Sequence, residues 1–177
     1  MPDRRRPTAI HEAAHAVADH RAGFNPIGVT IVPDHDRGTE GAEHQLDGPR
    51  LYLNAVGELC QDSDDSRAFI VSLLAGLAAN LEDGQPADEA ALGAEGDVED
   101  AQDRLQQWGL EWSLDDAMRA AREFVQREWR VIEAVAAELL DRETLDDTEI
   151  ELVILRADGD ADTEADLVQY REFIKRK

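Results

Sequence analysis

The feature that most restricts the fold is the segment from Ser66 to Leu81, which is apolar on nearly every side when drawn as a helix. A helix without a polar face must be surrounded by other elements. We therefore expect a buried central helix here, with the rest of the domain packed around it. Its most apolar part, Ile70 to Ala79, is about half the roughly 20 residues that a bilayer crossing needs, so no membrane span is predicted.

Helical signals dominate the rest of the chain, and the predicted fold class is mainly α with a small β element. Pro7 and Gly23 suit the two ends of a first helix. Ser113 and Asp116 resemble a capping box that opens a long amphipathic helix. The helices are expected at about 7–22, 66–81, 96–107, 114–141, 146–155 and 163–175, the strands at 27–32 and 42–46, and a loop at 82–96.

The expected organisation is one domain over residues 1–155, followed at 156–177 by an acidic linker and a C-terminal amphipathic helix. The linker contains Asp158-Gly159-Asp160, and the helix carries apolar residues such as Leu167 and Phe173. Amphipathicity does not decide whether this helix packs on the body of the protein or on a second copy.

Charge and cysteine content exclude several classes of protein. Lys and Arg number 18 against 40 Asp and Glu, giving a formal net charge of −22. Nucleic-acid binding is driven by basic side chains that displace counterions, so no nucleic-acid partner is expected. The single Cys60 cannot form an internal disulfide, and the N-terminus has no apolar signal region. We therefore expect a cytoplasmic protein.

The motif that carries chemistry is His11-Glu12-Ala13-Ala14-His15, an H-E-x-x-H pattern. Four residues of α-helix turn about 400°, so both imidazoles face one way and can bind one zinc ion. Glu12 lies about 100° round from His11, close enough to act as general base on a zinc-bound water. The alternative, a solvent-facing histidine pair, would expose three polar groups along a helix whose other side is apolar.

A zinc peptidase needs a third protein ligand. The metzincin continuation fails, because Ala18 and Arg21 stand where that class has Gly and His. Asp97 is the better candidate, since it opens a helix after a Gly-containing loop. Other candidates lie in the polar stretch after the first strand, and they are His35, Glu40, Glu43 and His44.

Four segments in order resemble the peptidase domain of the FtsH-type ATP-dependent zinc metalloproteases. The H-E-A-A-H helix is followed by Val29-Thr30-Ile31-Val32-Pro33, like the family's V-T-I-x-P strand. The later segments resemble G-G-R-A-A, G-A-S-N-D and E-T-L-D-G-E-E-I, and they are residues 75–79, 93–97 and 143–150. The resemblance covers about residues 8 to 155. It implies a helical zinc-peptidase fold, with His11, His15 and Asp97 as ligands and Glu12 as base.

The predicted function is that of a zinc metalloendopeptidase acting on a peptide or unfolded protein. The sequence has no G-x-x-x-x-G-K-[ST] motif, so we expect no ATPase module and no ATP-driven unfolding by the chain itself. A separate ATPase partner and a homo-oligomer both stay open. Glu95 and Gly96 replace the family's Ser and Asn before the ligand, which motivates an alternative: a proteolytically inactive zinc-binding module that regulates or binds a partner. A third alternative is an acidic helical bundle without metal.

Overall fold

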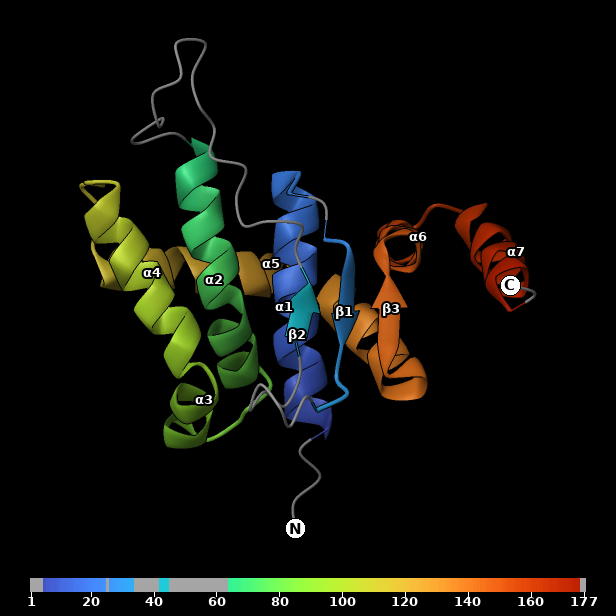
Figure 1. Cartoon of the computed structure of the whole chain (residues 1–177), viewed down its shortest axis with the longest axis horizontal. Coiled ribbons are helices and arrows are strands. Elements are labelled where there is room, and N and C mark those ends of the chain that lie inside the picture. Colours follow the sequence, from blue (N-terminus) through green and yellow to red (C-terminus); the bar gives the residue numbers. More distant parts are fainter. Residues whose placement is uncertain (1–4, 25, 34–41, 45–63, 176–177) are drawn as a thin grey trace.

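A computed structural model describes residues 5–24, 26–33, 42–44 (backbone) and 64–175 (Figure 1). The fold of these residues is mainly α-helical with a small antiparallel sheet, which confirms the predicted fold class. The helices are α1 (Arg5–Ala22), α2 (Asp64–Glu82), α3 (Ala87–Gly93), α4 (Glu95–Gln107), α5 (Leu114–Arg142), α6 (Asp147–Asp158) and α7 (Thr163–Ile174). The strands are β1 (Gly28–Thr30), β2 (Ala42–His44) and β3 (Thr144–Asp146).

Helix α2 is the buried central helix that its composition predicts. It packs against α1 on one side, α4 on the other and α5 behind (Figure 1). Ile70 and Leu74 are almost completely buried, and each side chain of this size stabilises the fold by about 1.5–3 kcal/mol when removed from water. Helices α1 and α2 run antiparallel, since Arg6 pairs with Asp83 at the end of the contact where α1 begins and α2 finishes.

Local signals fix the ends of the helices that form the core. Gly23 follows α1 with φ of +76°, a conformation that glycine adopts without steric cost. The Ser113 hydroxyl accepts a hydrogen bond from the backbone N–H of Asp116 and so caps α5, as predicted. These signals set where α1 and α5 begin or end. Both helices pack against α2.

The sheet has the strand order β2-β1-β3 and lies beside α1 (Figure 1). In its register Gly28 lies opposite His44 on β2 and Asp146 on β3. β1 is shorter than the predicted strand 27–32, and β3 was not predicted. Glu143, with φ of +67°, turns the chain from α5 into β3, and its carbonyl accepts a hydrogen bond of 2.8 Å from the N–H of Ile31.

The loop predicted at 82–96 is wrong, because it contains the short helix α3. Pro86 occupies the N-cap of α3, and the following residues include strong helix formers. Ala90 is completely buried and attaches α3 to the body of the molecule. The turn at residues 83–86 therefore separates two helices and does not open a long loop.

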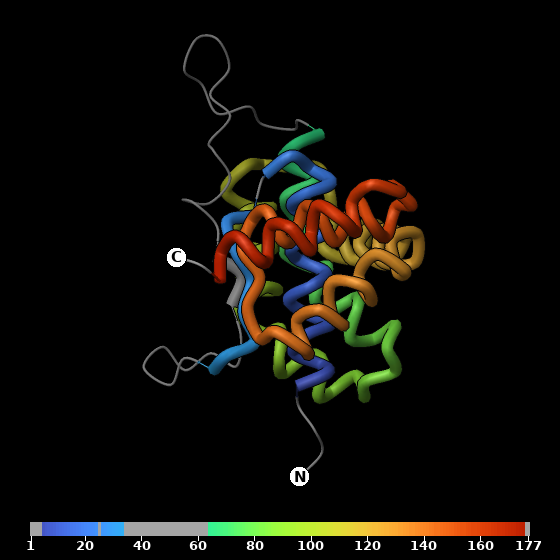
Figure 2. Tube along the Cα trace, turned by 90° about the vertical axis from the view of Figure 1, so that its right-hand side faces the viewer, coloured from blue at the N-terminus to red at the C-terminus, as the bar shows by residue number. Residues whose placement is uncertain are grey.

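Helices α6 and α7 lie on the side of the molecule that faces the viewer in Figure 2. A C-terminal ion cluster, formed by Glu138, Glu149, Arg156 and Arg171, joins them to α5. Leu167 of α7 is 1% exposed and belongs to the same core as α1 and α2. The predicted domain boundary at residue 155 stays a prediction. Helix α6 continues past this residue to Asp158.

In the part of the chain that the structure describes, no helix combines the length and the hydropathy needed to cross a membrane.

Candidate metal centre

Helix α1 carries both histidines of the H-E-x-x-H motif on the face that meets α2. Their Nε2 atoms are 3.0 Å apart, and the ring planes are inclined at 73°. The His11 and His15 side chains are only 12% and 9% exposed. Since the one-turn spacing directs both rings to one point, two nitrogen donors are already in place before any third residue is considered.

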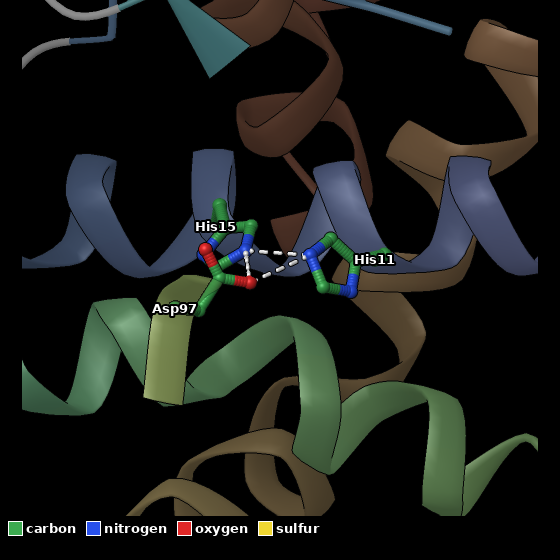
Figure 3. Close-up of side chains that lie close together, drawn as sticks. All are labelled: His11, His15 and Asp97. Carbon is green, nitrogen blue, oxygen red and sulfur yellow. Dashed lines mark hydrogen bonds and ion pairs between the residues drawn. The ribbon is translucent and has the colours of Figure 1, made fainter. Parts of the chain in front are cut away.

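Asp97 of α4 supplies an oxygen to the same point (Figure 3). Its Oδ2 atom is 3.0 Å from Nε2 of His11 and 3.5 Å from Nε2 of His15. Asp97 lies in the first turn of α4, and α4 packs on α2, which in turn packs on α1. Burial alone would raise the pKa of the Asp97 carboxyl, but the two imidazoles beside it hold it well below its usual range. The group is therefore a carboxylate at neutral pH.

The three donor atoms fit a zinc ion. Ligand atoms 2.0–2.1 Å from a tetrahedral zinc ion are about 3.3 Å from one another, and the observed separations of 3.0, 3.0 and 3.5 Å lie on both sides of that value. Two imidazoles and one carboxylate also match the donor types that zinc accepts. Three protein ligands are the number typical of catalytic zinc sites, whose fourth position takes water.

The tautomer of His15 is determined by its second nitrogen. Its Nδ1 lies 2.8 Å from the backbone carbonyl oxygen of Ser72, in the buried interface of α1 with α2. A carbonyl oxygen can only accept, so Nδ1 must carry the hydrogen. In the neutral ring, Nε2 then has a free lone pair, which can bind a metal ion or accept a hydrogen bond from Nε2–H of His11. An outer hydrogen bond of this kind accompanies most metal-binding histidines.

Gly76 of α2 makes room for the His11 ring. A Cβ atom built on Gly76 would lie 2.6–2.7 Å from three atoms of that ring, far closer than real contacts allow. No side chain larger than hydrogen is therefore compatible with the observed position of the imidazole. The glycine is part of the site although it offers no donor atom.

Glu12, the predicted base, is buried at 8% exposure and directly follows His11 on α1. Asp97 is the most accessible of the three potential ligands, with 31% of its side chain exposed. No described contact tests the role of Glu12 as base, so this role stays a prediction.

The structure brings together the three residues predicted as ligands, and they form the only such group of His, Cys, Asp and Glu among the described residues. Of the other candidates, His35 and Glu40 lie outside the described part of the chain. Glu43 and His44 are placed only by the backbone of β2. Whether the group binds a metal stays a prediction.

Sequence reasoning missed Ser72, Asp19 and Gly76. The Ser72 hydroxyl donates a hydrogen bond to Oδ1 of Asp19, which lies one helical turn beyond His15. Two signals were present: the polar row His11, His15, Asp19 at a spacing of four residues, and a serine and a glycine inside an otherwise apolar helix. Neither signal shows which residue the side chain contacts, because these contacts join two different helices.

Comparison with known proteins adds no assignment: no family model matches the chain, and no curated protein matches it.

Proposed function

We propose that this chain is a zinc metallopeptidase of the FtsH type, which hydrolyses peptide bonds with Glu12 as general base. The observation that carries the proposal is the convergence of the Nε2 atoms of His11 and His15 with Oδ2 of Asp97, at separations of 3.0–3.5 Å. The sequence resemblance supports it, because it selects the same three residues from two distant segments.

The site contains the groups that such a reaction needs. A zinc ion held by His11, His15 and Asp97 would polarise the scissile carbonyl and make a water molecule more acidic. The Glu12 carboxylate would take the proton from the attacking water and deliver it to the nitrogen of the leaving amine. Glu12 is offset from the two histidines around the helix, so it can take part in proton transfer without occupying a ligand position.

The proposed substrate is a peptide or an unfolded protein bound as an added strand. β2 is at the edge of the sheet in the order β2-β1-β3, and α1 lies beside it. An edge strand offers unpaired backbone groups to an extended peptide. The candidate docking edge is residues 41–46, of which 41, 45 and 46 lie outside the described residues. Delivery of substrate by a separate ATPase, or assembly into a homo-oligomer, would extend this proposal.

The second candidate is a zinc-binding module without proteolysis, which regulates or binds a partner. The observation that favours it is the burial of the site, since His11, Glu12 and His15 each expose 12% or less. A metal that only stabilises the contact of α1 with α4 needs no wider opening. The retained Glu12 favours the peptidase, because a purely structural metal site does not use a base.

Metal analysis tests the site common to both candidates. We expect one zinc ion per chain by elemental analysis after dialysis, and a loss of binding in His11→Ala, His15→Ala and Asp97→Ala. His20→Ala is the matched control, because His20 lies on the same helix outside the group. A chain that binds no zinc, or that keeps full affinity in Asp97→Ala, overturns the site.

Substitution of Glu12 by Gln separates the two candidates. Removal of a general base should lower cleavage of casein or of a fluorogenic peptide by about 10²–10⁴-fold, while zinc content is unchanged. Glu151→Gln removes one exposed carboxylate from α6 and serves as control. Zinc-loaded protein with no cleavage points to the inactive module. Cleavage that survives Glu12→Gln unchanged contradicts the role of Glu12.

A further inference from the structure

Asp19 has a completely buried carboxyl group that the proposed reaction does not use. It follows His15 by one turn of α1, so His11, His15 and Asp19 form a row on the face that meets α2. Carboxylates are almost never buried without polar partners, because removal from water is costly. The described partner of its Oδ1 atom is the hydroxyl of Ser72, which is itself only 2% exposed.

Ser72 contacts both Asp19 and His15, through different atoms. Its hydroxyl donates to Asp19, and its backbone carbonyl accepts from Nδ1 of His15 at 2.8 Å. The two contacts are one helical turn apart on α1, at the level where α2 crosses the metal centre. The bond from Ser72 to Asp19 therefore restricts how far α2 can slide or rotate against α1, and with it the position of the carbonyl that fixes the His15 ring.

We propose that Asp19, acting through Ser72, is a positioning residue that holds His15 in the tautomer with Nε2 free for a metal. This inference rests on the proposed metal site but not on peptidase activity. Partners that lie behind a metal ligand typically change metal affinity by 10–100-fold when they are removed. The same hydrogen-bond chain should act in the metal-free protein, because both of its bonds join protein atoms alone.

Three variants test the hydrogen bond between Ser72 and Asp19. Ser72→Ala removes the donor, and Asp19→Ala removes the acceptor. Asp19→Asn replaces the carboxyl group by an amide and keeps an oxygen at the same place, so the Ser72 hydroxyl can still donate to it. Leu167→Ala is the control for a general loss of stability, because this core residue belongs to α7 and not to the contact of α1 with α2.

Zinc affinity, measured by competition with a chromophoric chelator, is the first readout. We expect Ser72→Ala and Asp19→Ala to bind zinc 10–100-fold more weakly than the natural chain. Asp19→Asn should recover most of that loss, and Leu167→Ala should bind zinc normally although its unfolding midpoint falls. If Asp19→Ala does not fold, Ser72→Ala and Asp19→Asn decide the matter.

The His15 tautomer in the metal-free protein is the second readout, from long-range proton–nitrogen NMR correlations of the imidazole. If Ser72 and Asp19 only stabilised the fold, their substitution would leave the His15 tautomer unchanged. We expect the Nδ1–H form in the natural chain and a larger Nε2–H population in Ser72→Ala. The inference is overturned if folded Ser72→Ala keeps both the tautomer and the zinc affinity, or if Asp19→Asn loses as much affinity as Asp19→Ala. Zinc binding without peptidase activity would overturn the proposed reaction alone.

Discussion

At the scale of single residues, the candidate site depends on a missing side chain as much as on those present. Alanine at position 76 should be more favourable than glycine by about 1 kcal/mol if helix propensity alone decided. The His11 ring, only 2.6–2.7 Å from a Cβ atom at that position, opposes this gain. Overpacking in a well-filled core costs about 1–3 kcal/mol, so steric conflict should outweigh propensity.

We therefore predict that Gly76→Ala lowers the free energy of unfolding and weakens zinc binding. The measurement is urea unfolding together with a chelator competition. Gly93→Ala is the matched control, because a Cβ atom on this helical glycine meets nothing within 4 Å. A Gly76→Ala protein that is as stable as the Gly93→Ala protein and binds zinc equally well would show that the ring can move away without cost.

The residues of the site differ in how far the sequence could predict them. His11 and His15 follow from spacing alone, because helical geometry brings positions four apart to one side. Asp97 lies on another helix, and no local pattern gives the contact; its place at the start of a helix and the family resemblance selected it. Ser72 and Asp19 could not be paired in advance, since their contact depends on the register of α2 against α1.

At the scale of elements, the longer helices and the strands β1 and β2 were predicted, whereas α3 and β3 were not. Helices α1 and α5 have several turns of regular apolar spacing and recognisable end signals, and α2 has a long segment that is apolar on nearly every side. α3 and β3 span seven and three residues, too few for a period to be seen. Their structure depends on partners: Ala90 is buried against the body, and Leu145 pairs with Val29 of β1.

The attachment of α6 and α7 to α5 should depend on pH through Glu138. Burial raises the pKa of its carboxyl, but hydrogen bonds from Arg156 and Arg171, at 2.7 Å each, lower the pKa by more than burial raises it. The net result is a pKa below the ordinary value of 4.5. A carboxyl with a depressed pKa in the folded state contributes stability above its unfolded pKa. That stability is lost as the pH falls through the folded value.

Glu138→Gln should therefore cost roughly 2 kcal/mol at pH 7, where the charged hydrogen bonds are intact. The cost should shrink progressively below about pH 4.5, as Glu138 in the natural chain becomes protonated. Urea unfolding of both proteins between pH 7 and pH 3 measures the difference and cancels the titration of other groups. A cost that stays constant over this range would contradict the role of the ion pairs.

At the scale of the whole molecule, the formal net charge of −22 on 177 residues opposes compaction. Self-repulsion of this size is screened by salt, with a Debye length of about 10 Å at 0.1 M and about 3 Å at 1 M. We predict that sodium chloride raises the thermal midpoint of the metal-free chain between about 0.02 and 0.5 M. Calorimetry measures this shift. A falling midpoint would mean that salt weakens the stabilising ion pairs by more than it weakens the destabilising repulsion.

A bound zinc ion should add to stability by mass action. At free zinc 100 times above the dissociation constant, the gain is about 2.7 kcal/mol, provided that the unfolded chain does not bind the ion. We predict a rise of the urea midpoint with zinc in the natural chain and none in Asp97→Ala. Magnesium chloride at the same concentration is the control for charge screening. Equal shifts with both salts would argue against a specific site.

The turn at Gly84, with φ of +87° and nothing within 4 Å of a Cβ atom there, separates the two histidines from Asp97 along the chain. A gene cut at this codon would give one peptide with α1 and α2 and another with α3 to α7. Each half would carry part of the metal centre, so zinc should strengthen their association, which the core contacts of α1 and α2 with α5 already favour. Tagged with the fragments of a split reporter, the halves would turn the intracellular supply of the ion into a light signal.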